Sequence, residues 1–333
     1  MPTHPTSSSS GTHHVTITRG IPMPTPRPVI EGAQVKMAPD NPQMTRDELL
    51  AFVKGADVIV SMFHDKIDAK FLAAAGPQLK GVCNFAVGVD NIDLTACGAA
   101  KVIATNTPDA VTEGTANLAL GLLLDVARRI SEGDRFVRTG QFEKHGNGFP
   151  LGWMGMHLAG QTMLIVGAGR IGKALAMRAQ ALGMKILYTA RSSHIDFEQA
   201  PLAAQRVELE DGLRIADVVS IHTPLTPQTR HLMNAARLAM LKPTAILINT
   251  SRGPTVDEAA LVAVLQQRRI WGAGLDVFEH EPKVHPGLLT LDNVVLTPHV
   301  GSAEQRWREE MTRMVFANAT AILAGKSPPN RVG

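Results

Sequence analysis

A glycine fingerprint between an apolar run and a helical stretch constrains this chain more than any other feature. The run 162–166 leads straight into Gly167-Ala-Gly169-Arg-Ile-Gly172, and a helical pattern then continues to residue 182. In this setting the first glycine permits a tight turn, the second lets the backbone approach a pyrophosphate, and the third lets helix and strand pack closely. Phosphates would bind the N–H groups at the positive end of that helix. We therefore predict a dinucleotide-binding domain, against the alternative that the glycines form only a structural turn.

Short β-branched runs alternate with helical stretches on both sides of the fingerprint, which is typical of parallel α/β sheets. The capping pair Thr45 and Glu48 predicts one helix start, and Asp68 predicts another helix that ends near Gly76. Longer helices are expected over 112–129, long enough to connect two lobes, and over 302–325, with Met311 and Met314 in the core. The expected strands are 15–19, 58–61, 81–85, 102–105, 162–166, 184–188, 218–222, 245–249, 272–276 and 293–296.

These elements predict an α/β protein with two Rossmann-like, doubly wound parallel-sheet domains and a cleft between them. The last helix must bury its apolar stripe, so we expect it to pack back on the smaller, N-terminal sheet. The predicted organisation is a flexible tail over 1–13, a flavodoxin-like substrate domain over 14–106 and 300–333, and a dinucleotide-binding Rossmann domain over 107–299.

Composition excludes several other classes of protein. Among the 333 residues, 44% are hydrophobic and 19% charged, as in ordinary globular domains, and the net charge of +3 indicates no nucleic-acid or membrane partner. The two cysteines, Cys83 and Cys97, form no disulfide framework and no metal motif. The Ser-rich start has no apolar core, and no apolar segment is long enough to span a bilayer. We expect a cytoplasmic protein with reduced thiols.

The residues after the second strand of the fingerprint domain indicate which coenzyme binds. An NAD site usually places an acid there to bind the ribose 2′-hydroxyl, but Thr189 holds the position, and the run 188–193 contains no acid. Arg191 and Ser192 follow, and could bind a 2′-phosphate through charge-assisted hydrogen bonds. We predict that NADPH is preferred and that NADH remains possible; the alternative is that Arg191 is a solvated loop charge.

Three reactive side chains follow strands of the same sheet. Arg252, Glu281 and His299 should converge at the carboxyl edge, where ligands of open parallel sheets bind. Reduction of a 2-oxo acid needs a bidentate cation for the carboxylate, a proton donor for the carbonyl oxygen, and a carboxylate that orients that donor. Arginine, histidine and glutamate match these needs. Singly, each could be a surface or core residue, and the spacing leaves Glu279 and His280 as competitors for the acid role.

Other histidines and serines are weaker candidates for a catalytic or metal-binding role. His222 is interpreted as structural in a cofactor loop, with catalysis as the less favoured alternative. His280 and His285 form no compact ligand set, so we expect no metal site. Ser220 and Ser251 lack the Gly-x-Ser-x-Gly elbow of serine hydrolases.

With these motifs in place, the chain resembles the D-2-hydroxyacid dehydrogenases, and most closely their glyoxylate/hydroxypyruvate reductase branch. The resemblance runs from about Val15 to the C-terminus. The motifs that carry it are 85–93 (FAVGVDNID), 106–109 (NTPD), 133–138 (GDRFVR), 167–172, 249–253 (NTSRG), 275–282 and 296–302 (LTPHVGS).

The resemblance implies a role for each matching residue. It makes Arg252 the catalytic arginine, His299 the acid/base, and Glu281, the glutamate before proline, the catalytic carboxylate. Val87 and Gly88 would bind the substrate carboxylate with their amides, together with Arg252 and His299. The cofactor contacts implied or predicted are Thr115, Gly167, Gly169, Arg170, Ile171, Gly172, Thr189, Arg191, Ser192, Thr223, Pro224, Thr229, Thr250, Asp276 and Gly301. Family members are usually homodimers whose cofactor domains pair, and the 149–153 loop resembles the stretch that crosses to the partner.

The predicted function is NADPH-dependent reduction of glyoxylate or hydroxypyruvate to glycolate or glycerate. Phe63 and His64 stand where relatives carry smaller or other residues, and a bulkier pocket wall would favour glyoxylate. Two alternatives remain. One is a phosphoglycerate dehydrogenase or another D-2-hydroxyacid dehydrogenase, and the other is a corepressor-like protein that senses NAD(H).

Overall fold

The computed structural model describes residues 12–40, 43–146 and 152–333. The chain divides into two compact units. Unit 1 combines Met1–Val111 with Ala303–Gly333, and unit 2 is Thr112–Ser302. The expected boundaries at 106/107 and 299/300 therefore move to 111/112 and 302/303, because the helix that opens unit 2 begins at Thr112.

Unit 1 is built on a six-stranded sheet in which an antiparallel strand joins five parallel ones. The order is β13-β5-β4-β3-β1-β2, so the parallel strands follow the flavodoxin-like order 2-1-3-4-5. The strands are β1 (His13–Ile17), β2 (Ala33–Met37), β3 (Val58–Ser61), β4 (Gly81–Asn84), β5 (Ile103–Thr105) and β13 (Arg331–Val332).

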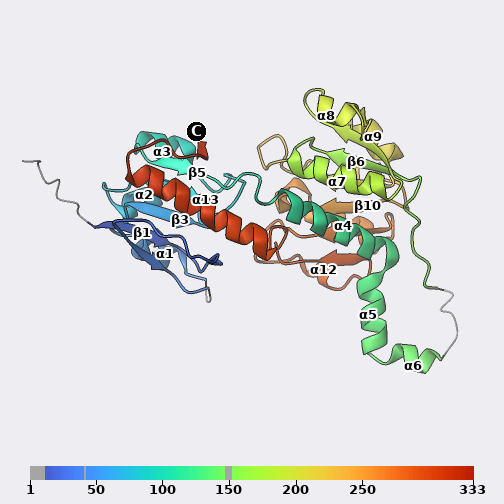
Figure 1. The fold of residues 1–333 in the computed structure, drawn as a ribbon. Helices are drawn as coiled ribbons and strands as arrows, with labels where there is room; N and C mark the ends of the chain where they lie inside the picture. Colours follow the sequence, from blue (N-terminus) through green and yellow to red (C-terminus); the bar gives the residue numbers. More distant parts are fainter. Residues whose placement is uncertain (1–11, 41–42, 147–151) are drawn as a thin grey trace, which may run out of the picture. The chain divides into compact units, whose positions relative to one another are not determined.

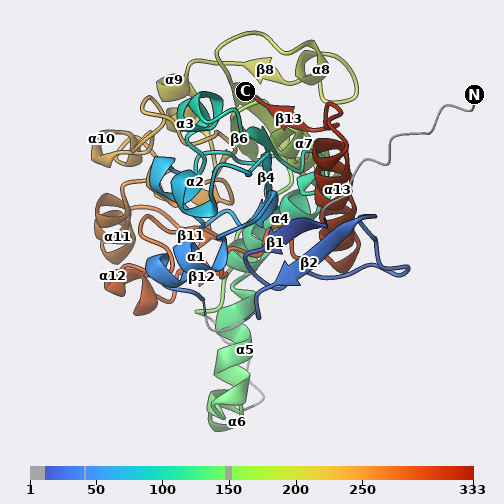
Figure 2. The same cartoon turned by 90° about the vertical axis from the view of Figure 1, so that its left-hand side faces the viewer.

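Helices cover both faces of this sheet (Figure 2). The capping box of Thr45 and Glu48 opens α1 (Arg46–Phe52), and Asp68 caps α2 (Ala69–Ala75), as predicted. These helices and α3 (Leu94–Ala99) pack into one apolar cluster with the sheet. The last helix, α13 (Gln305–Leu323), packs against β3, β4 and β5. This confirms that the C-terminal helix returns to the first sheet, with Met311 buried and Met314 half-buried.

Unit 2 contains a seven-stranded parallel sheet in the order β12-β11-β10-β9-β6-β7-β8. Counted from β6, this is the Rossmann order 3-2-1-4-5-6 with one further strand. The sequence order reverses between β6 and β9, which is where such sheets bind dinucleotides. The strands are β6 (Thr162–Val166), β7 (Lys185–Thr189), β8 (Gln205–Arg206), β9 (Val218–Ile221), β10 (Ile246–Asn249), β11 (Gly272–Leu275) and β12 (Val294–Leu296).

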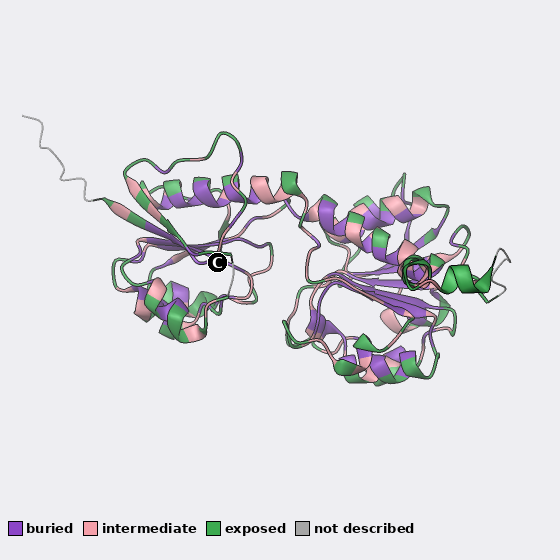
Figure 3. Ribbon diagram, turned by 90° about the horizontal axis from the view of Figure 1, so that it is seen from below, coloured by how far each residue is buried: buried purple, intermediate pink, exposed green. Residues whose placement is uncertain are grey.

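Two helical layers bury this sheet between them, and Figure 3 shows its strands as a buried band. One face packs against α4 (Thr112–Arg128) and α7 (Arg170–Ala181). The other face packs against α9 (Leu209–Ile215), α10 (Ala235–Leu238), α11 (Glu258–Gln266) and α12 (Pro286–Leu289). A short helix, α8 (Ile195–Glu198), follows β7, and the 3₁₀ turn η1 (Gly253–Thr255) follows β10.

Two further helices of unit 2 project from its body. They are α5 (Ile130–Arg138) and α6 (Gln141–His145), as Figure 1 shows. Neither helix contains a buried residue. Three of their apolar side chains are exposed: Ile130 is 56% exposed, Val137 57% and Phe142 48%.

The structure corrects several predicted details. The predicted tail ended at residue 13, but β1 begins at His13, and residues 1–11 lie outside the described ranges. β2, α3, α5, α6, β8 and β13 were not predicted. Most of the predicted 149–153 loop also lies outside the described residues. Within them, no helix has the length and apolar character needed to cross a membrane. Cys83 and Cys97 are buried free thiols, and burial raises the pKa of Cys83 to about 12.

Candidate active site

The glycine fingerprint lies at the turn from β6 into α7, and each glycine has its own spatial reason. Gly167 has φ +106°, and a Cβ added there would lie 2.8 Å from the carbonyl of His222. Gly172 approaches so closely that an added Cβ would lie 2.5 Å from the Gly167 oxygen. Beside Gly169 an added Cβ would meet nothing within 4 Å, so space is open where the helix N-terminus begins. This cradle suits a pyrophosphate.

Buried hydroxyl groups near this edge support the same fit. Thr250 directly follows β10 and is 8% exposed, and its hydroxyl has no hydrogen-bond partner among the described residues. The hydroxyl of Thr223, which follows β9, is also buried and also has no hydrogen-bond partner among the described residues. Because a buried polar group without a partner is destabilising, these hydroxyls suit a bound polar ligand. The described residues at the carboxyl edge therefore fit a dinucleotide.

Thr115, Asp276 and Gly301 come together although they are far apart in sequence. A Cβ added at Gly301 would lie 3.2 Å from both the Thr115 hydroxyl and Asp276 Oδ2. Asp276 is 1% exposed, and its carboxylate accepts hydrogen bonds from the Thr297 hydroxyl (2.6 Å) and the amides of Val300 (2.9 Å) and Gly301 (2.8 Å). Asp276 therefore holds the segment that carries His299.

The other predicted cofactor residues occupy the same edge of the sheet. Thr189 ends β7, and the exposed Arg191 and Ser192 follow it. Arg170 and Ile171 form the first turn of α7. Pro224 and Thr229 lie in the loop after β9, where the Thr229 hydroxyl donates to the Pro224 carbonyl (2.6 Å).

His222 is packed against the glycine turn at this edge. Its ring nitrogen Nε2 lies 2.9 Å from the Ser220 hydroxyl, and its backbone packs against Gly167. Burial lowers the pKa of His222 to about 4, so the ring is neutral near pH 7.

His299 and Glu281 form a hydrogen-bonded pair at the carboxyl edge. His299 Nδ1 lies 2.8 Å from Glu281 Oε2, and both side chains are partly exposed. The Phe278 amide donates to the second carboxylate oxygen at 3.0 Å, which fixes the carboxylate plane. A carboxylate at Nδ1 orients the imidazole ring and selects its tautomer.

Electrostatics keep Glu281 ionised. Burial raises the pKa of Glu281, but the hydrogen bond and charge of His299, the Phe278 amide and the charge of Arg252 together outweigh burial. The net effect is a pKa below the ordinary glutamate value. Glu281 is therefore a carboxylate at neutral pH, with Arg252 close enough to influence it.

Arg252 stands at the turn between β10 and η1. Asn249 Nδ2 and the Thr255 hydroxyl both donate to the Arg252 carbonyl, at 3.1 and 2.6 Å. The next residue, Gly253, is pressed against the segment after β11, since an added Cβ would lie 1.9 Å from the Phe278 carbonyl. The arginine turn and the glutamate segment are therefore packed backbone to backbone.

The competitor Glu279 has other partners. Its Oε1 lies 2.6 Å from His231 Nε2 and accepts from Arg230 at 3.2 Å, and its amide donates to Glu258 at 2.7 Å. His280 makes an isolated bridge with Lys283. The structure thus brings Glu281, and not Glu279 or His280, to His299.

Val87 and Gly88 lie in unit 1, in the loop after β4. The Val87 carbonyl accepts from Asn106 Nδ2 and the Gly88 carbonyl from Asn84 Nδ2, both at 2.8 Å. Their amide N–H groups donate to no acceptor in the described part of the chain. The hydrogen bonds to the two carbonyls hold this loop in place, and the loop presents the two amide N–H groups as donors.

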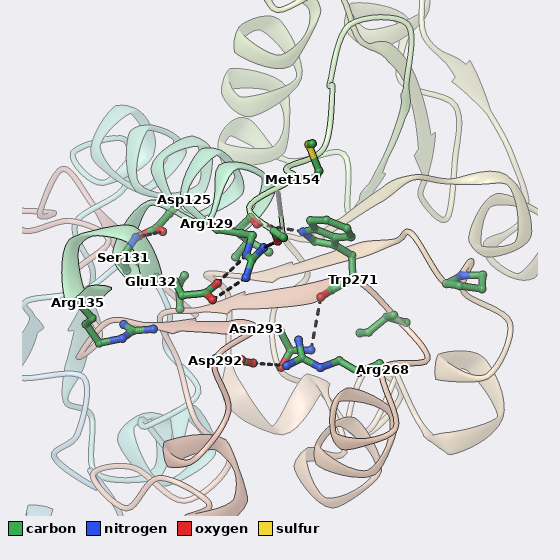
Figure 4. Close-up of a pocket in the computed structure, with 15 residues that line it drawn as sticks. Asp125, Arg129, Ser131, Glu132, Arg135, Met154, Arg268, Trp271, Asp292 and Asn293 are labelled. Atoms are coloured by element: carbon green, nitrogen blue, oxygen red, sulfur yellow. Dashed lines mark hydrogen bonds and ion pairs between the residues drawn. The ribbon is translucent and has the colours of Figure 1, made fainter. Parts of the chain in front are cut away.

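A cavity of about 530 Å³ in unit 2 lies away from these residues. Pro243, Trp271 and Asn293 line it, and each precedes a strand, so it belongs to the amino edge of the sheet (Figure 4). Within the described residues, no group of three His, Cys, Asp or Glu side chains could hold a metal ion.

Sequence reasoning missed two residues that build the site: Asn249 and Gly253. Asn249 and Gly253 stand inside the 249–253 motif, so the motif itself was the signal that could have found them.

Comparisons with known proteins agree with this architecture. The family model described as "D-isomer specific 2-hydroxyacid dehydrogenase, NAD binding domain" matches residues 120–301. The glyoxylate reductase of Thermococcus onnurineus is 45% identical over 96% of this chain and 95% of that protein.

Two crystal structures are similar over nearly their whole length. Protein TT0316 of Thermus thermophilus has a TM-score of 0.88 and 40% identity, covering 96% of this chain and 100% of that one. An NADPH-dependent glyoxylate/hydroxypyruvate reductase from Sinorhizobium meliloti, in complex with NADP and malonate, has a TM-score of 0.82 and 31% identity, covering 97% of each chain. The chain belongs to the D-isomer specific 2-hydroxyacid dehydrogenase family and is an NAD(P)-dependent oxidoreductase.

Proposed function

We propose that the protein reduces glyoxylate, and hydroxypyruvate as a second substrate, with NADPH as the preferred coenzyme. The observation that carries the proposal is the His299–Glu281 pair, whose 2.8 Å contact lies at the same sheet edge as the glycine cradle and the Arg252 turn. Relatives named glyoxylate reductase and the structural neighbour from Sinorhizobium meliloti support this choice of substrate.

The chain's own residues divide the work of reduction. When bound at the glycine cradle, the dinucleotide would supply a hydride to the carbonyl carbon. Arg252 binds the substrate carboxylate, because its planar guanidinium can make two parallel hydrogen bonds. The amides of Val87 and Gly88 are proposed as further carboxylate donors. His299 delivers a proton from Nε2 to the carbonyl oxygen, since Nδ1 is engaged by Glu281, and the product is the 2-hydroxy acid.

NADPH preference is supported by the end of β7. Thr189 holds the position where an acid would bind a ribose 2′-hydroxyl, and such an acid would repel a 2′-phosphate. Arg191 and Ser192 are exposed and follow directly. We propose that they bind the phosphate.

The test is NADPH oxidation, followed by its near-ultraviolet absorbance, with glyoxylate, hydroxypyruvate, pyruvate and phosphohydroxypyruvate. We expect glyoxylate to have the highest kcat/KM. Highest turnover with phosphohydroxypyruvate would favour a phosphoglycerate dehydrogenase. Absence of turnover with all four would overturn the enzyme proposal, and would favour a dinucleotide-sensing protein if NADPH still bound.

Variants separate the proposed roles. His299→Ala should abolish turnover while NADPH affinity stays nearly unchanged.

Arg252→Lys should raise KM strongly, because lysine cannot make the bidentate contact. A KM near that of the wild type would contradict Arg252 as the carboxylate-binding residue.

We also propose a homodimer formed through unit 2. Tertiary packing of an apolar face stabilises most helices in proteins, and α5 has no buried residue to supply such packing in full. The exposed Ile130, Val137 and Phe142 lie on α5 and α6, and the cavity of Figure 4 adjoins α5 through Ser131 and Glu132. A second copy of this chain would cover these apolar side chains.

A further inference from the structure

Arg206, at the end of the edge strand β8, lies against the segment that follows β7. In the ladder, Arg206 is opposite Tyr188, so its side chain starts beside the end of β7. Its Nε and Nη2 donate to the Ala190 carbonyl at 3.1 and 2.9 Å, and Nη2 also reaches the Arg191 carbonyl at 3.5 Å. The guanidinium of Arg206 therefore lies beside the backbone carbonyls of Ala190 and Arg191.

Hydrogen bonds also hold the C-terminal end of the same segment, at residues 193 and 194. The amide of His194 donates to the hydroxyl of Tyr188 at 2.9 Å, and Tyr188 is fully buried. Ser193 donates to Glu198 Oε1 at 2.8 Å, and the Tyr188 hydroxyl donates to the same oxygen. Arg191 and Ser192 thus lie between two fixed points, so their backbone is ordered before a ligand arrives, and little ordering entropy remains to be lost on binding.

The charges around this segment also matter. Hydrogen bonds to carbonyl groups leave the guanidinium charge of Arg206 in place, and its Nη1 makes no hydrogen bond within the described residues. Glu198 is the opposing charge. The pKa of Glu198 lies below its ordinary value. Hydrogen bonds from the Tyr188 and Ser193 hydroxyls are the main causes, and the charges of Arg206 and His194 lower it further. Arg206 therefore offsets a carboxylate that would otherwise oppose an anionic ligand beside Arg191.

We propose that Arg206 is a further determinant of coenzyme specificity, and that its guanidinium acts with Arg191 and Ser192 to attract the 2′-phosphate of NADPH. The proposal rests on the NADPH preference proposed above. A 2′-phosphate adds roughly one and a half to two negative charges that NADH lacks, so only the phosphorylated coenzyme gains from this cation.

The test measures binding by isothermal titration calorimetry for three ligands: NADPH, NADH and 2′,5′-ADP, which carries the phosphorylated ribose without the nicotinamide. The variants are Arg206→Gln, Arg206→Lys and Arg191→Gln. The matched control is Arg214→Gln, which removes the same charge from an exposed arginine of α9 that pairs with Asp211. Since α9 leads into the start of β9, Arg214 belongs to the opposite edge of the sheet.

We expect Arg206→Gln to weaken NADPH and 2′,5′-ADP binding by about 10-fold, as for a lost interaction with a charged group, while the Kd for NADH changes by less than about two-fold. Arg206→Lys should retain most of the preference because it keeps the charge. Arg214→Gln should change none of the three affinities.

Three results would overturn the proposal or its basis, and they are distinguishable. If Arg206→Gln weakens NADPH and NADH equally, Arg206 only supports the segment. If it alters neither coenzyme while Arg191→Gln abolishes the preference, Arg206 is uninvolved and the NADPH proposal stands. If the wild-type protein binds NADH as tightly as NADPH and ignores 2′,5′-ADP, the proposed NADPH preference itself fails.

Discussion

At the scale of single residues, the proposed chemistry depends on which carboxylate meets His299. Two glutamates stand two positions apart after β11, and only Glu281 reaches the histidine, whereas Glu279 pairs with His231 and Arg230. Spacing in the sequence left this choice open. The backbone path between the two glutamates decided it.

Replacing Glu281 by glutamine keeps the size of the side chain but removes its charge. The variant weakens the contact that orients the His299 ring, so we expect kcat/KM for glyoxylate to fall by about 100-fold or more, within the range of general acid–base effects. Glu279→Gln is the control from the same segment, and a larger loss there than in Glu281→Gln would contradict the assignment.

Gly253 offers a second prediction at this scale. Alanine at position 253 would place its Cβ 1.9 Å from the Phe278 carbonyl, so the Arg252 turn or the glutamate segment must move. We expect turnover to be nearly lost, because a displacement of about 1 Å can reduce the rate by about 100-fold. The control is Gly121→Ala on the exposed face of α4, where an added Cβ meets nothing within 4 Å. It should retain full activity and should not lower Tm.

At the scale of elements, local signals predicted well where a cap or a buried run was present. The capping box at Thr45, the Asp68 cap and the strands β3 and β6 appear where the sequence predicted them. The missed elements lack such signals for physical reasons. β2 is an edge strand with mostly exposed side chains, α5 buries none, and β8 and β13 are two residues long.

Asp68 allows a test of an element's electrostatics. Burial raises the pKa of Asp68, but the Phe71 amide and the charges of Arg46 and Lys66 outweigh burial and lower it. A lowered pKa in the folded state stabilises the protein above the unfolded value of about 3.9, and that stabilisation is lost as the pH falls through the folded value. The variant Asp68→Asn keeps a good helix cap but cannot titrate.

Urea unfolding at about pH 6 and about pH 3 measures this contribution. The wild-type protein should be more stable than Asp68→Asn at the higher pH, and the difference should shrink at the lower pH. An equal difference at both values would mean that the carboxylate charge contributes nothing.

At the scale of the whole molecule, the open question is what covers α5 and α6. Val137 is 57% exposed on α5, and we propose that a second copy of the chain packs there. Val137→Asp should therefore convert a dimer into a monomer, as measured by sedimentation equilibrium. Ile215→Asp, at an apolar residue of α9 that is 50% exposed, is the matched control and should leave the dimer intact. A monomeric wild-type protein would overturn the proposal.

The sequence by itself determined the residues that act within one turn or one strand. The glycine fingerprint, the helix caps and the positions of Arg252 and His299 after apolar strands could all be read from neighbours along the chain, because φ/ψ preference and apolar periodicity are local properties. Only the tertiary structure decided which distant groups meet. Glu281 meets His299, Gly253 packs against Phe278, Asp276 holds the His299 segment, and Arg206 donates to the Ala190 carbonyl. Each of these contacts joins segments that become neighbours through the order of strands in the sheet or through the packing of loops. Neither the strand order nor the loop packing is encoded in any single stretch of residues.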